Sequence, residues 1–144
     1  RQVSMTVEQG GRCLLGGEIP DGPGWFYPAT LLVDVTPEMQ VSCEETFGPI
    51  AVVMKADSVE QAVIMANDTA YGLAASVWTA DTAMAERMAR DLEAGQVAIN
   101  GIVKTDPRLP SGGIKRSGFG RELGPHGILE FVNLQQVWVG PKTD

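Results

Sequence analysis

Two adjacent acids, followed by an aromatic residue and a rigid corner, are the residues of this chain best placed to bind a ligand. The segment reads Glu44-Glu45-Thr46-Phe47-Gly48-Pro49. Pro49 fixes its own φ and disfavours the helical conformation at Gly48, so this corner sets the direction of the side chains before it. The apolar run 50–54 follows directly and is typical of a strand buried on both faces. Glu45 and Phe47 are therefore predicted to lie at one end of a sheet strand, where α/β proteins often bind ligands. On this hexapeptide alone, however, a surface turn with two solvated acids is the favoured interpretation.

The two cysteines and the single histidine do not form a recognisable catalytic centre. Cys43 is followed by two carboxylates, Glu44 and Glu45, that would repel a thiolate, whereas an activated nucleophile needs the opposite. Neither chain length nor cysteine density indicates a disulfide scaffold, so Cys13 and Cys43 are both predicted to be thiols. His126 follows a proline at the start of an expected helix and is predicted to be structural. The sequence also has no metal-ligand spacing, P-loop or G-x-G-x-x-G after a strand.

Composition excludes several classes of partner. The 144 residues carry a formal charge of −7, which repels nucleic acid and anionic lipid, so neither a nucleic acid nor a membrane partner is expected. No window approaches the roughly 18 consecutive apolar residues of a membrane span, and the N-terminal residues lack the apolar core of a signal peptide. The expected location is the cytoplasm. With 44% hydrophobic residues, the chain can build the core of about one globular domain.

Helix and strand patterns alternate through the middle of the chain. Ser58 and Asp81 are predicted to cap amphipathic helices over 58–67 and 81–92. Strand, helix, strand, helix, strand with short links predicts parallel strands joined by right-handed crossovers, and hence a layered α/β sheet. The other expected elements are a helix tail in 1–11, a helical turn in 124–131, and strands over 12–15, 30–35, 50–54, 74–78, 96–99 and 134–139.

The stretch 100–121 is long, non-periodic and rich in glycine and proline, which is typical of functional loops. Lys115, Arg116 and Arg121 form a small basic cluster there. A solvated face is the default interpretation of such a cluster. Anion binding by the glycine-rich backbone is the alternative, although no phosphate-loop signature supports it.

Four motifs in order resemble the C-terminal third of an NAD(P)-dependent aldehyde dehydrogenase, over essentially the whole chain. They are Gly-Trp-Phe-Tyr-Pro at 24–28, the segment 44–49, Ala-Asn-Asp-Thr-Ala-Tyr-Gly-Leu-Ala-Ala at 66–75, and Pro-Ser-Gly-Gly-Ile-Lys-Arg-Ser-Gly-Phe-Gly-Arg-Glu at 110–122. The resemblance implies that the cofactor is NAD or NADP. It also implies that Glu45 holds the nicotinamide ribose hydroxyls and that Phe47 touches the nicotinamide ring. The sequence leaves the choice between NAD and NADP open.

The same resemblance implies a parallel-sheet, three-layer portion of the catalytic domain at 1–126 and an oligomerisation arm at 127–144 in a homodimer or homotetramer. In this family a cysteine thiolate attacks the aldehyde, hydride passes to the nicotinamide, and a glutamate-activated water hydrolyses the thioester. Neither Cys13 nor Cys43 matches the nucleophile motif, so no catalytic residue is expected here and the chain is expected to be inactive by itself. A non-catalytic oligomerisation module derived from this fold is the alternative, and a free-standing flavodoxin-like domain is disfavoured.

The loop 99–110 resembles succinate-semialdehyde dehydrogenases, in which a hydroxyl at the place of Thr105 binds the substrate carboxylate. A hydroxyl donor suits a carboxylate acceptor. Ser111 stands where many members have phenylalanine, so the pocket wall there is expected to be more open or more polar. The expected substrate is a small aldehyde, with succinate semialdehyde favoured and other semialdehydes open.

Overall fold

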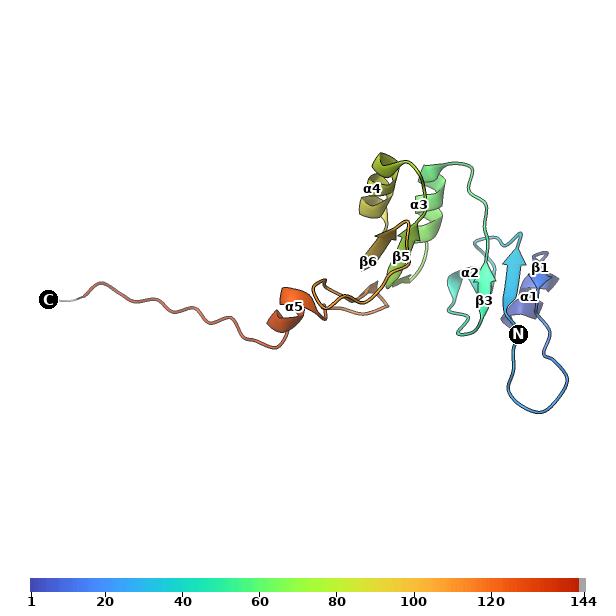
Figure 1. Cartoon of the computed structure of the whole chain (residues 1–144), viewed down its shortest axis with the longest axis horizontal. Helices are drawn as coiled ribbons and strands as arrows, with labels where there is room; N and C mark the ends of the chain where they lie inside the picture. Colours follow the sequence, from blue (N-terminus) through green and yellow to red (C-terminus); the bar gives the residue numbers. More distant parts are fainter. Residues whose placement is uncertain (143–144) are drawn as a thin grey trace. The chain divides into compact units, whose positions relative to one another are not determined.

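A computed structural model describes residues 1–142 of the chain (Figure 1). The chain forms two compact units that divide between residues 70 and 71. We call residues 1–70 the first unit and residues 71–142 the second unit, and we describe each by itself. The boundary expected at 126/127 is a different kind of division, and it stays a prediction.

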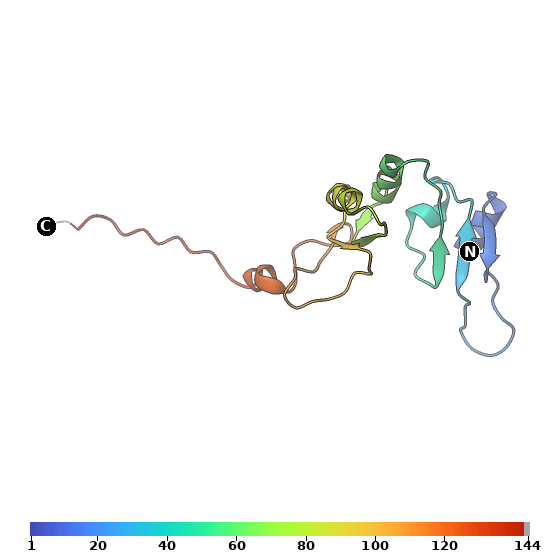
Figure 2. The ribbon, with the colours of Figure 1, turned by 45° about the horizontal axis from the view of Figure 1, so that its top comes forward.

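A three-stranded sheet forms the centre of the first unit. Its strands are β1 (Arg12–Leu15), β2 (Thr30–Val33) and β3 (Ile50–Val52), in that spatial order. β1 runs antiparallel to β2, with a register shift between Cys13 and Leu15. β2 and β3 run parallel, with Thr30 opposite Ile50. The three strands lie side by side at the blue to green end of the chain in Figure 2.

The first unit also contains three helices, namely α1 (Gln2–Glu8), α2 (Gln40–Cys43) and α3 (Val59–Asn67). α1 packs against both α2 and β1. The buried core joins α1 and α2 to the central strand and consists of Val3, Leu32, Val35, Met39 and Val41. The predicted cap of α3 is confirmed, because the Ser58 hydroxyl accepts a hydrogen bond from the Gln61 amide. The single-turn helix α2 was not predicted.

The expectation that 50–54 is buried on both faces is wrong for the first unit. β3 ends at Val52, and burial alternates along it, with Ile50 and Val52 half-buried and Ala51 exposed. Val53 is 53% exposed. Within this unit the core covers one face of the sheet only, so the apolar run gains burial on one side. Trp25 is likewise fully exposed.

The second unit is built around one parallel strand pair. β5 (Ala74–Val77) and β6 (Gln96–Ile99) pair in parallel and are joined through α4 (Thr82–Asp91), as predicted. The Asp81 carboxylate accepts from the Met84 amide at 2.9 Å and so caps α4 as expected. The apolar stripe of α4 is centred on Ala85, which is fully buried.

Three further elements complete the second unit. β4 (Tyr71–Gly72) pairs antiparallel with β7 (Ile114–Lys115), and α5 (Gly124–Leu129) follows. Close packing requires glycine at 95, because a Cβ there would lie 1.9 Å from the Gly112 carbonyl oxygen. Gly112 and Gly113 thus pack directly against Gly95, at the start of β6.

The predicted mixed α/β content is confirmed, but a single parallel sheet is not seen. Residues 1–142 contain three separate sheets, and β3 pairs with β2 instead of with β5. An alternating helix and strand pattern indicates parallel strands but not which strands are neighbours, so the sequence did not determine the partner of β3. The expected strand 134–139 is not paired within the described part of this chain, and its pairing with a neighbouring subunit stays a prediction. That segment runs extended with no strand partner among residues 1–142.

Candidate functional site

The loop 44–49 is held at both ends by backbone hydrogen bonds. At its start, the Glu44 amide donates to the Gln40 carbonyl at 2.9 Å and closes α2. At its end, the Ile50 amide donates to the Gly48 carbonyl and the Thr30 amide donates to the Pro49 carbonyl, both at 2.8 Å. The loop between these anchors is short, so its side chains are presented from a defined backbone.

The predicted position at one end of a sheet strand is confirmed, although the end differs from the one that α/β proteins commonly use. The loop enters β3 at its first residue, and β2 is parallel to β3, so the loop lies at the amino ends of this strand pair. Open α/β sheets usually bind ligands at the carboxyl ends. The position therefore gives no support of its own to a ligand site, and any support must come from the side chains.

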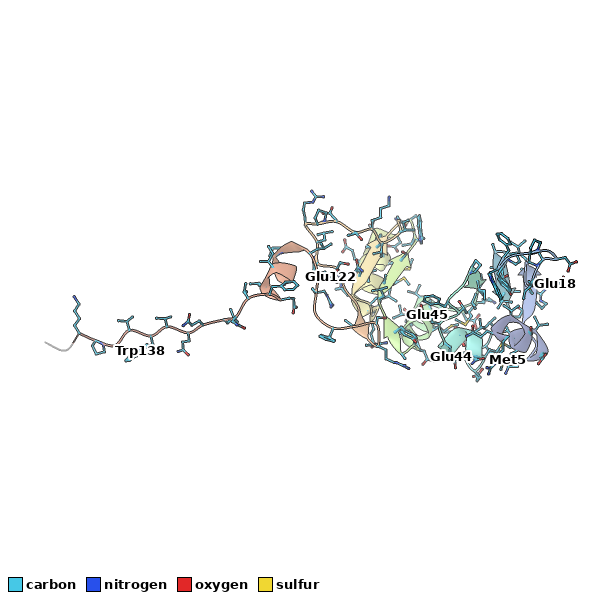
Figure 3. The ribbon with its side chains drawn as sticks, turned by 90° about the horizontal axis from the view of Figure 1, so that it is seen from below. Met5, Glu18, Glu44, Glu45, Glu122 and Trp138 are labelled. Atoms are coloured by element: carbon cyan, nitrogen blue, oxygen red, sulfur yellow. The ribbon has the colours of Figure 1, made fainter. Side chains whose placement is uncertain are left out.

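The two acids of the loop differ in their bonding. The Glu44 carboxylate accepts a hydrogen bond from the Gln40 side-chain amide at 2.6 Å, across one helical turn. Glu45 is exposed and has no hydrogen-bond or ion-pair partner among residues 1–142. Both side chains are labelled in Figure 3, on the segment that leaves α2. Of the pair, Glu45 is the acceptor left available to a ligand.

Phe47 combines two unusual properties. Its φ is +46°, in the left-handed region that non-glycine residues rarely adopt. Its side chain is 90% exposed, so burial of the ring does not account for the conformation. Unfavourable backbone conformations of this kind concentrate at ligand and active sites. The ring and the Glu45 carboxylate are two residues apart on one loop, which makes the loop a candidate site.

Thr105 and Ser111 lie on one loop of the second unit, with different surroundings. Ser111 is half-buried, forms a two-way backbone bridge with Glu122, and lines a hollow of about 340 Å³ between β6 and the loop. The Ser111 hydroxyl lies 3.5 Å from the Gln96 side-chain oxygen in the wall of this hollow. Thr105 is exposed and is not part of that lining. Ser111 is thus part of the wall of this hollow, and its role at a substrate pocket stays a prediction.

Asn100 fixes the start of this loop at the carboxyl ends of β5 and β6. The side-chain nitrogen Nδ2 of Asn100 donates to the Thr79 carbonyl, and the side-chain oxygen Oδ1 accepts from the Thr79 backbone amide, both at 2.9 Å. Its φ of +51° is a conformation that asparagine tolerates better than most residues. This role was not predicted from the sequence, although an asparagine directly after a strand is a signal that could have indicated it.

A bidentate ion pair shapes the turn after Thr105. The Arg108 guanidinium donates to both carboxylate oxygens of Asp106, at 2.9 and 2.6 Å. The hydrogen bond from this side chain, supported by the Arg108 backbone amide, lowers the pKa of Asp106. The same contact raises the pKa of Arg108. The ion pair between Asp106 and Arg108 thereby closes the turn that follows Thr105.

Each residue of the basic cluster has a partner within the second unit. The Lys115 ammonium pairs with Glu93 at 2.6 Å, and the Arg116 guanidinium lies 5.7 Å from the centroid of the Tyr71 ring. Arg121 donates to the carbonyls of Gly113 and Gly120 at 3.0 and 2.6 Å. These contacts are typical of a structural role, although the ring contact leaves the N–H donors of the Arg116 guanidinium without an acceptor among residues 1–142.

Cys13 and Cys43 are free thiols, as predicted, and each sulfur donates to a backbone carbonyl oxygen. The described residues contain no group of three or more His, Cys, Asp or Glu side chains able to hold a metal ion. None of the helices in this part of the chain has both the length and the apolar character needed to span a bilayer.

The predicted site residues fall into two pairs. Glu45 and Phe47 lie together on the loop 44–49 of the first unit, and Thr105 and Ser111 lie on one loop of the second unit. The model of the aldehyde dehydrogenase family matches residues 1–137. The chain belongs to the aldehyde dehydrogenase family. The family resemblance inferred from the motifs is therefore confirmed.

Several members of the aldehyde dehydrogenase family resemble this chain over nearly its whole length. A probable NADP⁺-dependent succinate-semialdehyde dehydrogenase of Synechocystis is 51% identical, with 96% of this chain and 30% of the relative covered. Succinate-semialdehyde dehydrogenase [NADP⁺] 1 of Mycobacterium ulcerans is 48% identical, with 97% and 31% covered. The chain thus spans about 30% of the length of these curated relatives.

Solved structures give the same result. The succinic semialdehyde dehydrogenase of Streptococcus pyogenes, in complex with NADP⁺, is 34% identical with a TM-score of 0.91, and the match covers 97% of this chain and 31% of that one. A lactaldehyde dehydrogenase structure is 37% identical with a TM-score of 0.92, covering 97% and 29%. The fold of this aldehyde dehydrogenase chain is therefore shared by relatives with different aldehyde substrates.

Proposed function

We propose that this chain is part of an NAD(P)-dependent oxidoreductase that oxidises an aldehyde to the carboxylic acid, and that the loop 44–49 binds the nicotinamide end of the cofactor. The observation that carries the proposal is the unpartnered, exposed carboxylate of Glu45 beside the exposed ring of Phe47. Its context is a chain of the aldehyde dehydrogenase family, some of whose solved relatives are complexes with NAD⁺ or NADP⁺.

The donor and acceptor chemistry of the loop fits such a cofactor. An ionised carboxylate is purely an acceptor, with two oxygens that can receive hydrogen bonds from two neighbouring hydroxyls, as a ribose presents. Charge-assisted hydrogen bonds of this kind are stronger than neutral ones. Phe47 offers an exposed aromatic face suited to a flat heterocycle. Glu45 and Phe47 would therefore hold the ribose and the nicotinamide ring respectively.

The role of this chain in the reaction is to bind and orient. A bound nicotinamide supplies the hydride acceptor for aldehyde oxidation. Glu45 contributes by fixing the ribose and Phe47 by limiting the ring's movement, which is catalysis through positioning. Neither cysteine is offered as the nucleophile, because an activated thiol needs a neighbouring base or cation and both sulfurs face backbone carbonyls. The nucleophile and the general base are expected outside these 144 residues.

Succinate semialdehyde is the favoured substrate. Relatives named for this activity match the chain at 48% and 51% identity, and the loop 99–110 that resembles theirs carries an exposed Thr105 hydroxyl. A hydroxyl can donate to the distal carboxylate that distinguishes this substrate from a simple aldehyde. Ser111 would contribute a small, polar wall to the substrate pocket. Its place in the lining of the 340 Å³ hollow supports this role.

The Glu45→Gln variant of the complete protein tests the cofactor site. Loss of the charge should weaken the ribose hydrogen bonds and lower kcat, together with nicotinamide nucleotide affinity, by about tenfold. Steady-state kinetics and nucleotide titration by fluorescence measure these effects. Glu18→Gln is a matched control, since Glu18 is also an exposed, unpartnered acid in the first unit. Equal kinetics for the parent and both variants would remove Glu45 from the site.

We also propose that residues 127–144 act as an oligomerisation arm. Leu134, Val137 and Trp138 are between 76% and 96% exposed, on an extended segment without a partner strand among residues 1–142 (Figure 3). Exposed β-prone segments are normally covered by another strand. Deletion from Leu134 onward should convert a dimer or tetramer into monomer or aggregate, as measured by light scattering after size exclusion. An unchanged oligomeric mass would exclude the arm as the assembly element.

The alternative is a non-catalytic oligomerisation module, and assembly alone does not distinguish it from the enzyme. Nucleotide binding distinguishes the two, because a module that only assembles does not need a Glu45 carboxylate that binds ribose. An assembled protein that binds neither NAD⁺ nor NADP⁺ would favour the module.

A further inference from the structure

The side chain of Gln40 makes a contact that the cofactor loop depends on. Its amide nitrogen Nε2 donates to Glu44 Oε2 at 2.6 Å, and the Glu44 backbone amide donates to the Gln40 carbonyl at 2.9 Å. Gln40 and Glu44 are therefore joined twice across α2. The reverse orientation of the amide would place two acceptor oxygens against each other, so the nitrogen must face Glu44.

That orientation leaves the other end of the amide unsatisfied. Gln40 Oε1 is buried and accepts no hydrogen bond from residues 1–142. A buried, unpaired polar oxygen lowers stability, and each such group in a folded protein calls for an explanation. A methionine at this position would fill similar space without the cost. Stability alone thus does not explain why glutamine stands here.

Gln40 is also well placed to act as an anchor. The residues on either side, Met39 and Val41, are each 5% exposed and belong to the core of the first unit. A side chain that projects from between two core residues has a fixed base. The Glu44 carboxylate, which this side chain binds, is therefore fixed relative to the core as well as relative to the loop.

We infer that Gln40 is a positioning residue for the nicotinamide cofactor, acting through Glu44. It engages the first acid of the pair so that the second, Glu45, is the one presented to the ribose hydroxyls. Without the Gln40 contact the two adjacent carboxylates can exchange places at the ligand, and the loop binds in more than one arrangement. This inference rests on the proposed function of the loop 44–49.

The test compares Gln40→Met in the complete protein with the parent, by titration with NAD⁺ and NADP⁺ and by thermal unfolding. Methionine keeps the length of the side chain and removes both the donor and the buried oxygen. We expect nucleotide binding to weaken about three- to fivefold, as for the loss of one partly exposed hydrogen bond, while the melting temperature stays the same or rises. Gln9→Met is the matched control, because Gln9 is an exposed glutamine at the end of α1, and it should change neither quantity.

A second variant tests the mechanism by rescue. Gln40→Lys supplies an ammonium donor to Glu44 four residues away and also lacks the buried oxygen, so binding should return to within about twofold of the parent. Failure of this rescue, or a fall in the melting temperature of Gln40→Met large enough to explain the weaker binding, would make Gln40 a structural residue and overturn the inference.

The Glu45→Gln variant separates this inference from the proposed function. Weaker binding in Glu45→Gln with unchanged binding in Gln40→Met would overturn the role of Gln40 and leave the cofactor site in place. Unchanged binding in both would overturn the cofactor site and the role of Gln40 with it.

Discussion

Two charged segments of this chain differ in what their side chains are bonded to. The loop 44–49 presents an acid, Glu45, that has no partner among residues 1–142, beside a Phe47 ring that is 90% exposed. In the segment 112–122, by contrast, all three basic residues are engaged within the second unit. Sequence alone presents both as charged, glycine-containing loops.

The difference shows that charge in a loop indicates a ligand site only when the charge is unsatisfied. Arg121 uses its guanidinium to tie together the carbonyls of a glycine-rich turn. Glycine 95 is required by the same packing, since the Gly112 carbonyl leaves no room for a Cβ. The segment 112–122 therefore serves packing, while the loop 44–49 has an acceptor, the Glu45 carboxylate, left for a ligand.

Arg121→Gln tests this comparison with the largest expected effect. Loss of two half-buried hydrogen bonds to carbonyls should destabilise the protein by about 1–2 kcal/mol. Nucleotide affinity should stay at the parent's value, in contrast to Glu45→Gln. Urea denaturation and nucleotide titration on the same samples measure both. Arg116→Gln, which loses a cation–π contact instead, should cost less. A loss of affinity without a loss of stability in Arg121→Gln would mean that the basic cluster binds the anionic cofactor.

Thr105→Val extends the comparison to the second unit, because the Thr105 hydroxyl is exposed and unpartnered, as Glu45 is. Valine keeps the shape and removes the donor. KM for succinate semialdehyde should rise about fivefold, which corresponds to the typical net contribution of one hydrogen bond, with KM for butanal unchanged. Parallel steady-state assays with the two aldehydes measure the ratio. An equal rise for both would assign Thr105 to loop structure rather than to carboxylate recognition.

Much of the fold was predictable from local signals. Ser58 and Asp81 cap α3 and α4 as their sequences indicate, because a cap involves only neighbouring residues. The short elements α2, β4 and β7 were not predicted. Their two to four residues are too few for a periodic pattern, and they exist because of partners distant in the sequence. The pairing of β3 with β2 was missed for the same reason.

The candidate site was predictable only in part. The roles of Glu45 and Phe47 were predicted because the motif resembles a known family. Their position at the amino end of a strand pair is evidence neither for nor against a ligand site. Gln40 was missed although it stands at helical i, i+4 spacing from Glu44, because nothing else in 36–44 indicates a helix. Asn100 was missed because its role requires two strand ends to be adjacent.

The ion pair between Asp106 and Arg108 gives the smallest expected effect and tests how a satisfied charge behaves with pH. The hydrogen bonds from Arg108 lower the pKa of Asp106 below its ordinary value of 3.8 in the folded protein. A carboxyl whose folded pKa is depressed contributes stability above the unfolded pKa, and that stability is lost as pH falls through the folded pKa. Asp106→Asn should therefore lower the melting temperature slightly at pH 7.

The difference between Asp106→Asn and the parent should then shrink as the pH falls below about 4, and it should also shrink in 1 M salt, which screens exposed charges. Thermal scans over a pH series measure it. Asp57→Asn is a control for an exposed pair, since the Lys55 and Asp57 side chains are 88% and 80% exposed and lie 3.4 Å apart, against bidentate contacts for Asp106. A melting difference for Asp106→Asn that stays constant from pH 7 to pH 2 would show that Asp106 acts through its shape and backbone contacts and not through its charge. In that case the turn that carries Thr105 would be closed by packing, and the contrast between satisfied and unsatisfied charges would hold for the basic cluster alone.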